Sequence, residues 1–292
     1  MKQVTATISM ISVEKVKESI MDIKNNKGLS ASFIKTIALI FMFIDHFAAS
    51  IVMRLMYRPM HPVMQQIAKW VPEQTDATVL IMTIYQWMRN VGRISFPIYC
   101  FFIVEGFFYT KSRTKYAARL AVCALISELV FDLALYGKIF YFFHQNVFFT
   151  LLIGLCGIWA MDRILTKADW TKGKKFILTA LSIVGFMLAA EILFTDYSSI
   201  GVLVIAVMYM IRKFVPDKVK FKAPIAFTAG TAVLCFLSLG EAWALLALPL
   251  MFFYKGKKGW NAKWFFYLFY PVHLLLLAIV AICLGILNFG II

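Results

Sequence analysis

Two histidines stand in long apolar stretches of the chain, where a titratable side chain is rare. His46 ends the segment KTIALIFMFIDH, in which ten residues separate it from Lys35, and His273 stands in a second apolar run near the C-terminus. An imidazole titrates near neutral pH, so it can take up or release a proton or briefly carry an acyl group. We predict a chemical role for His46. A histidine that only hydrogen-bonds to a neighbour is the alternative for both residues.

Two carboxyl groups share an apolar stretch of the same kind. Glu128 and Asp132 are four residues apart and therefore lie on one face of a helix. Carboxylates at that spacing repel each other unless a cation or a shared proton intervenes, and Arg93 is the predicted cation for Asp132. An ion pair that fixes helix packing explains these three residues as well as catalysis does.

A third acid in an apolar run is Glu105, in the segment FFIVEGFFYT. Arg119 or Lys35 is predicted to neutralise it, and a packing role is again the alternative. A fourth acid, Asp45, directly precedes His46. Because neighbours along a helix do not face each other, the carboxylate that orients the imidazole is expected to come from another helix.

The apolar runs that hold these residues dominate the composition. Of 292 residues, 62% are hydrophobic and 15% are charged, and the mean hydropathy is +0.80. Soluble domains carry about 45–50% apolar residues and about a quarter charged ones. Helices of about 20 apolar residues cross a bilayer, so the sequence predicts an all-α polytopic membrane protein with about nine transmembrane helices. The predicted spans are Ala31–Met53, Ile94–Thr110, Ala117–Tyr136, Val147–Met161, Phe176–Phe194, Ile200–Ile211, Ala223–Leu239, Ala242–Tyr254 and Trp264–Ile291.

Orientation follows from the basic residues. Most of the 30 lysines and arginines fall in the N-terminal tail and in alternate connections, which predicts a cytoplasmic N-terminus and an outside C-terminus. The net charge of +15 is thus a sign of topology and not of nucleic-acid binding. The apolar piece Ala77–Met88 is too short for a span and is assigned to an outer loop at about 54–90. Residues 1–28, with an amphipathic helix at Val13–Lys24, form a cytoplasmic segment before the transmembrane domain at 29–292.

Depth within the bilayer can be compared between the first and last spans. At about 1.5 Å per residue, His46 lies about 16 Å from Lys35, and His273 about 15 Å from Lys263. The two histidines are therefore predicted to share one depth. The five cysteines have no paired spacing, so neither a zinc motif nor any other metal site is expected.

The spacing of Lys35 and His46 matches the Arg/Lys-x10-His pattern of transmembrane acyltransferases of the acyltransferase-3 type. The chain more widely resembles the TraX family, named for the protein that acetylates the N-terminus of conjugative pilin. The similar segments are IALIFMFIDH, GRISFPIYCFFIVEGFFYT, YAARL, ISELVFDL, NVFFTLLIGL and KWFFYLFYPVHL.

This resemblance implies transfer of an acetyl group from cytoplasmic acetyl-coenzyme A to an amine or hydroxyl acceptor in or beyond a bacterial cytoplasmic membrane. The acceptor is a protein N-terminus, a glycan, a lipid or a small amphiphile, and membrane lipids surround the protein. The catalytic residues implied are His46, as general base or acyl carrier, with Glu128 orienting it and Asp45 beside it. Cations for the phosphates of the coenzyme are Lys35, Lys111, Arg113 and Arg119. Substrate binding is assigned to Arg93, Asp132, Asn146, Glu105 and His273.

Two other functions compete with this one. A proton-coupled transporter or flippase would use the buried Glu, Asp and His side chains as a proton relay. A non-catalytic membrane component of a secretion or conjugation assembly would need none of them. The pair Lys35 and His46 favours the enzyme, because a transporter is expected to show inverted repeats, and the sequence has no evident one.

Overall fold

The computed structural model describes residues 28–72, 76–219, 221–261 and 263–287, and these residues form helices with no strand beyond isolated bridges. The all-α prediction is confirmed, while the helix predicted at Val13–Lys24 lies outside the described residues. The elements are α2 (Ala31–Phe47), η1 (Ala48–Val52), α3 (Met53–Met56), α4 (Pro62–Trp70), α5 (Ala77–Gly92), α6 (Ser95–Tyr109), α7 (Arg113–Tyr136), α8 (Val147–Leu165), α9 (Lys172–Ile192), α10 (Ser198–Phe214), α11 (Lys222–Leu237), η2 (Leu239–Ala247), α12 (Leu248–Phe253) and α13 (Lys263–Cys283).

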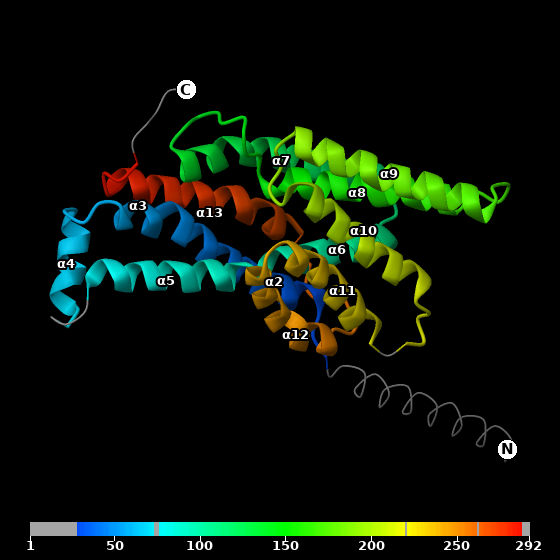
Figure 1. Cartoon of the computed structure of the whole chain (residues 1–292), viewed down its shortest axis with the longest axis horizontal. Coiled ribbons are helices and arrows are strands. Elements are labelled where there is room, and N and C mark those ends of the chain that lie inside the picture. Colours follow the sequence, from blue (N-terminus) through cyan, green and yellow to red (C-terminus); the bar gives the residue numbers. More distant parts are fainter. Residues whose placement is uncertain (1–27, 73–75, 220, 262, 288–292) are drawn as a thin grey trace, which may run out of the picture.

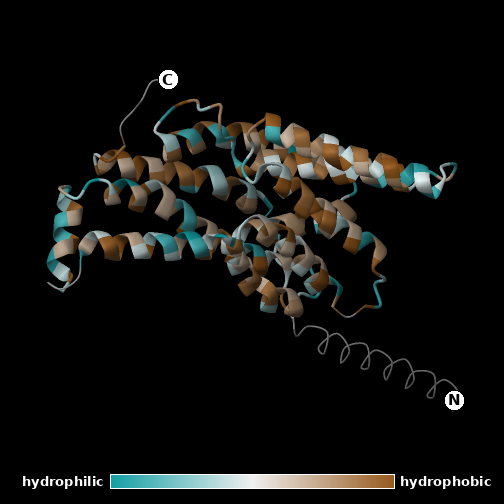
Figure 2. Ribbon diagram, viewed as in Figure 1, coloured by the Kyte–Doolittle hydropathy of each residue, from teal (hydrophilic) through white to brown (hydrophobic). Residues whose placement is uncertain are grey.

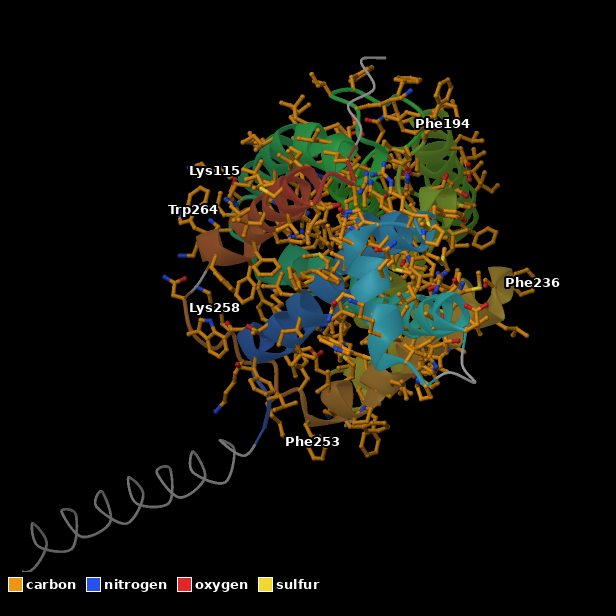
Figure 3. The ribbon with its side chains drawn as sticks, turned by 90° about the vertical axis from the view of Figure 1, so that its left-hand side faces the viewer. Lys115, Phe194, Phe236, Phe253, Lys258 and Trp264 are labelled. Atoms are coloured by element: carbon orange, nitrogen blue, oxygen red, sulfur yellow. The ribbon has the colours of Figure 1, made fainter. Side chains whose placement is uncertain are left out.

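The helices run mainly along the long axis of the molecule, and hydrophilic residues gather at its two ends, at α4 and at the α8–α9 turn (Figures 1 and 2). Seen along that axis, carbon-rich side chains project around the circumference (Figure 3). Among the described residues, five helical stretches are long and apolar enough to cross a membrane: Ala31–Met56, Ala77–Tyr109, Val147–Leu165, Lys172–Ile192 and Lys263–Cys283. The chain is a helical membrane protein. The count of nine crossings and the sides of the two termini stay predictions.

The region predicted as an outer loop contains α3, α4 and α5. Asp76 caps α5 by accepting a hydrogen bond from the amide of Thr78 (2.7 Å), and α5 packs against α2. Arg93 and Ile94 keep right-handed helical dihedral angles, so α6 continues in the direction of α5 (Figure 1). The chain does not turn back there, and α5 lengthens this helical stretch without adding a crossing in the opposite direction.

The span predicted at Ala242–Tyr254 is wrong as a single α-helix. The structure has the 3-10 helix η2 there, followed by the short helix α12. Pro249 lies in the first turn of α12, where its fixed φ and missing N–H are tolerated, whereas the interior of a longer helix would lose a hydrogen bond. The apolar run is helical from Leu239 to Phe253, but its winding changes at Leu248, and both elements pack against α11.

The first helical stretch changes its winding just after His46. α2 passes into η1, a π-helical segment, and then into α3; such segments often occur at functional sites. The Arg54 guanidinium donates hydrogen bonds to the backbone carbonyls of Ala134 (2.7 Å), Leu135 (3.0 Å) and Ser50 (2.6 Å). Because the first two carbonyls belong to the last turn of α7, Arg54 ties α3 to the end of α7 and fixes this part of the first helical stretch.

Candidate functional site

A cavity of about 560 Å³ lies between α2, α6, α7 and α13, and we call it the basic cavity. Its basic wall residues are Lys35, Arg119, Lys258 and Lys263. None of the four forms an ion pair with a carboxylate of the described residues. The Lys35 ammonium lies over the ring of Phe102, 4.8 Å from its centre. Lys258 lies on the same side of the molecule as Trp264, away from Phe236 (Figure 3).

The bonding of these cations indicates an anion site. Lys35 and Arg119 are partly buried, and the Arg119 Nε is buried without a hydrogen-bond partner. Partly buried positive charge is costly unless an opposite charge compensates it. A phosphate-bearing ligand would supply that charge, and a cavity of this volume lies within the range of small-molecule and cofactor sites.

Glu105 also lines the basic cavity, but its predicted pairing is wrong. Its carboxylate accepts hydrogen bonds from Arg212 Nε (2.7 Å) and from the Tyr254 hydroxyl (3.3 Å), and not from Arg119 or Lys35. α10 packs directly against α6, so Arg212 reaches this carboxylate from the neighbouring helix. Glu105 therefore leaves the positive charge of the cavity uncompensated.

A second, smaller cavity of about 60 Å³, the inner cavity, continues the first one. The two share wall residues on four helices: Met42, Tyr99, Val147, Leu151 and Tyr270. The inner cavity is lined in addition by Asp45, His46, Asp196 and Tyr197. Lys35 and His46, both on α2, thus stand in the walls of two adjoining cavities.

The predicted common depth of the two histidines is confirmed. His46 Nδ1 lies 2.7 Å from His273 Nε2, and the two rings are stacked with their centres 5.0 Å apart. His273 Nδ1 lies 2.8 Å from the carbonyl oxygen of Phe269, one turn earlier in α13. We call His46 and His273 the histidine pair. Tyr270, in the same helix, sets its ring edge-on to His46, and its buried hydroxyl has no hydrogen-bond partner in the described part of the chain.

The prediction that Glu128 orients His46 is wrong. The Glu128 carboxylate accepts hydrogen bonds from the backbone amide of Asn146 (3.0 Å) and from the Asn146 side chain. Asn146 also caps α8 through its bond from the amide of Phe148 (3.0 Å) and donates to the carbonyl of Ala124 (2.8 Å). These contacts fix the start of α8 against α7. Glu128 and Asn146 line neither cavity.

The predicted pair of Arg93 and Asp132 is also wrong. Arg93 forms an ion pair with Glu241 of η2, while the Asp132 carboxylate accepts a hydrogen bond from the backbone amide of Tyr141 (2.7 Å). Asp132 therefore holds the connection between α7 and α8. Because Glu128 is bonded to Asn146, Asp132 to Tyr141 and Arg93 to Glu241, the three residues form no shared relay.

Asp45 has a cation that sequence analysis did not identify. Arg89 of α5 donates a hydrogen bond to its carboxylate (2.6 Å). Gly92 permits this close approach, because a Cβ atom there would lie 2.3 Å from Asp45 Oδ1. Arg89 was assigned to a loop on the outer side, and only the helical course of α5 alongside α2 brings it to Asp45.

Asp196 is the second residue that the sequence did not reveal. It lies in the α9–α10 connection, where the neighbours Phe194, Tyr197 and Ser198 all have positive φ (49°, 59° and 41°). Such backbone is strained for residues other than glycine and clusters at functional sites. Asp196 faces His144, with 3.5 Å between Oδ1 and Nε2, and its hydrogen bond raises the pKa of His144, which lies in the α7–α8 connection.

Two predicted coenzyme cations do not line the basic cavity. Lys111 is exposed, and Arg113 forms an ion pair with Asp162 (2.9 Å) that Lys213 shares (2.5 Å). Lys258 and Lys263 take their place in the cavity wall. In the described residues, no group of three or more His, Cys, Asp or Glu side chains is arranged to hold a metal ion.

Comparisons with known proteins identify the family of the chain. The sequence profile of the TraX family, described as TraX protein, matches residues 30–281. A protein of Dichelobacter nodosus described as "Probable fimbrial assembly protein FimC, serogroup H1" is 30% identical over 219 residues, which cover 66% of this chain and 82% of that protein. No solved structure matches the chain.

Proposed function

Because the chain belongs to the TraX family, we propose that it is an integral membrane acetyltransferase that moves an acetyl group from acetyl-coenzyme A to an amine acceptor. The observation that carries this proposal is the adjoining pair of cavities. Unpaired cations line the larger cavity, and a histidine that can act as a base lines the smaller one.

The basic cavity would bind the donor. The phosphates of coenzyme A would form ion pairs with the basic residues of the cavity wall, which are Lys35, Arg119, Lys258 and Lys263. Bonds between cations and phosphate oxygens are among the stronger hydrogen bonds in proteins. With the phosphates held there, the flexible arm with its thioester would extend past the shared wall toward His46. The basic cavity would then open to the cytoplasm, where acetyl-coenzyme A is found.

The inner cavity would bind the acceptor. Its wall holds two carboxylates: Asp45, which is paired with Arg89, and Asp196, whose partner is the titratable His144. The wall therefore carries a net negative charge whenever His144 is neutral. That charge favours an amine, which arrives partly as an ammonium ion, over a neutral hydroxyl. An α-amino group has a pKa of about 7.7–8.0, so its neutral, nucleophilic form is present near neutral pH.

The transfer would proceed at the shared wall. The amine nitrogen forms a bond to the carbonyl carbon of the thioester, and His46 accepts the proton that the nitrogen loses. The carbon–sulfur bond then breaks, and the coenzyme A thiolate takes that proton from His46. Tyr270 lines both cavities, and its hydroxyl, which donates to no other group of the described residues, would donate a hydrogen bond to the carbonyl oxygen as negative charge develops on it.

The name of the Dichelobacter nodosus relative, a probable fimbrial assembly protein, supports a surface-fibre subunit as the acceptor. A peptide with a free N-terminus is therefore the first acceptor to test. Membranes containing the protein are incubated with radiolabelled acetyl-coenzyme A and a peptide, and label in the peptide is measured. The same peptide with a formylated N-terminus is the control acceptor.

We expect label in the free peptide only, and none in membranes that contain the His46→Ala variant. Label in a sugar hydroxyl and not in the peptide would overturn the amine assignment. If acetyl-coenzyme A is neither bound nor consumed by the wild-type protein, the acetyltransferase proposal fails. Proton-coupled substrate uptake that is lost on neutralising Glu128 or Asp132 would support the transporter instead.

A further inference from the structure

The hydrogen bonds of the histidine pair have a direction that the structure determines. The carbonyl oxygen of Phe269 can only accept, so the proton between it and His273 belongs to His273 Nδ1 (2.8 Å). A neutral imidazole with its proton on Nδ1 has a lone pair on Nε2. The contact of 2.7 Å from His273 Nε2 to His46 Nδ1 must therefore be donated by His46.

The state of the second nitrogen of His46 follows from this direction. Its proton stands on Nδ1, so its Nε2 carries the lone pair. No side chain of the described residues donates to that nitrogen. His46 lines the inner cavity, and Nε2 is the ring nitrogen that remains available to a molecule bound there.

We propose that His273 is a positioning residue that holds His46 as the Nδ1–H tautomer and so presents a basic Nε2 to the inner cavity. This inference rests on the proposed function and adds to it the group that sets the state of the base. The chain of bonds runs from the Phe269 carbonyl through His273 to His46. It replaces the carboxylate that orients a histidine in many other enzymes.

The surroundings of His273 keep this chain of bonds rigid. The residue is 3% exposed, and its ring contacts those of Phe269 (centres 5.0 Å apart) and Phe43 (6.2 Å). Asp45, the nearest carboxylate in sequence to His46, forms an ion pair with Arg89 instead of bonding to the imidazole. His273 is therefore the acceptor that decides which nitrogen of His46 bears the proton, because the bond made by one ring nitrogen fixes the state of the other.

The tautomer is tested first, without any need for activity. The protein has four histidines, so nitrogen-15 labelled histidine in bilayers gives few signals for solid-state NMR, and single variants assign them. We expect His46 and His273 each to show a protonated Nδ1 and an unprotonated Nε2. In His273→Phe, which keeps an aromatic ring, the His46 signal should lose its Nδ1–H form. A protonated Nε2 on wild-type His46, or an unchanged His46 signal in His273→Phe, would overturn the proposal.

Kinetics provides the second test. His273→Phe should lower kcat about 100-fold with the KM for acetyl-coenzyme A unchanged, since the donor cavity is intact and only the orientation of the base is lost. His273→Gln places an amide oxygen near the position of Nε2 and should recover about 10-fold of that loss. A purely structural role would lower the folded fraction of both variants alike and give no such recovery.

The outcomes separate this inference from the proposed function. Wild-type protein that has the expected tautomers but consumes no acetyl-coenzyme A would contradict the proposed function and leave the tautomer assignment intact. Normal turnover in His273→Phe, or equal losses in the Phe and Gln variants, would contradict the role of His273 alone.

Discussion

The basic cavity and the inner cavity share a wall, yet their charged side chains are bonded in different ways. In the basic cavity, Lys35, Arg119, Lys258 and Lys263 have no carboxylate partner in the described part of the chain, and two of them are exposed. In the inner cavity, Asp45 and His46 each have a partner within 2.7 Å. The first region has cations without a carboxylate partner, and the second has side chains fixed by short hydrogen bonds.

The two steps of the proposed transfer reaction would require this difference. Binding of a polyanionic donor uses charges that stay available until the donor arrives, and such charges act over several ångströms and are screened by salt. Proton transfer needs a base fixed within hydrogen-bond distance of its substrate. Variants in the basic cavity should therefore change KM and salt dependence, whereas variants in the inner cavity should change kcat.

The largest effect is expected at His46. His46→Ala removes the base and should lower the rate of acetyl transfer by about 100-fold to 10,000-fold, while the Kd for acetyl-coenzyme A stays within about twofold. Turnover and equilibrium binding of the donor are measured on the same preparation. His61→Ala is the matched control, because His61 caps α4 and hydrogen-bonds to the carbonyl of Leu284, away from both cavities. Wild-type turnover in His46→Ala would contradict the separation of the two regions.

The long helices could be predicted because bilayer thickness, apolar length and helix caps are local properties of the sequence. The shared depth of His46 and His273 followed from counting residues in two helices of constant rise. The partners of Glu105 and Arg93 could not be found in this way. Depth says how far a side chain lies along a helix, whereas pairing depends on which helices are neighbours, and here these are α10 and η2.

Two residues escaped prediction for different reasons: Asp196, which lines the inner cavity, and Arg89, which pairs with the wall residue Asp45. Arg89 was placed in a loop because the apolar part of α5 is short, although α5 and α6 form one helical stretch. Asp196 gave no signal, because positive φ at Phe194, Tyr197 and Ser198 cannot be inferred from residue types that rarely adopt it. Sequence reasoning thus singled out His46 and Lys35, which line the two adjoining cavities, but it missed Asp196 and the arginine partner of Asp45.

The next effect is expected at Lys35. Lys35→Ala should raise the KM for acetyl-coenzyme A about tenfold, the loss of one charge-assisted contact, and change kcat little. Lys35→Arg should stay near the wild type. The control is Lys115→Ala, since Lys115 is exposed and lies outside the cavity wall. The KM of the wild type should also rise more steeply with salt than that of Lys35→Ala, and parallel salt curves would contradict a role in donor binding.

Glu105 tests the contrast between the two cavities. It lines the basic cavity, but its carboxylate is fixed by hydrogen bonds, as Asp45 is in the inner cavity. Glu105→Gln weakens the bonds to Arg212 and Tyr254 and should destabilise the folded protein by about 1–3 kcal/mol. Thermal unfolding in detergent measures this change. The KM for acetyl-coenzyme A should remain within about twofold of the wild type. A large fall in KM without loss of stability would mean that Glu105 faces the donor directly.

The smallest effect concerns pH and the loop that carries Asp196. The hydrogen bond from His144 to Asp196 raises the pKa of His144 above its usual value of about 6.5. A raised pKa stabilises the fold fully below the unfolded-state value, and this contribution disappears as pH rises through the folded-state value. Asp196→Asn should therefore lower the melting temperature at pH 6 and lower it less at pH 8.5. The effect at pH 6 should be only about 1–3 °C, because both side chains are about one-third exposed.

The control is the same substitution in a His144→Phe background, where it should show no such pH dependence. A difference in melting temperature between wild type and Asp196→Asn that grows toward pH 8.5 would contradict the pairing of Asp196 with His144. It would then also contradict a contact between this inner-cavity carboxylate and the α7–α8 connection.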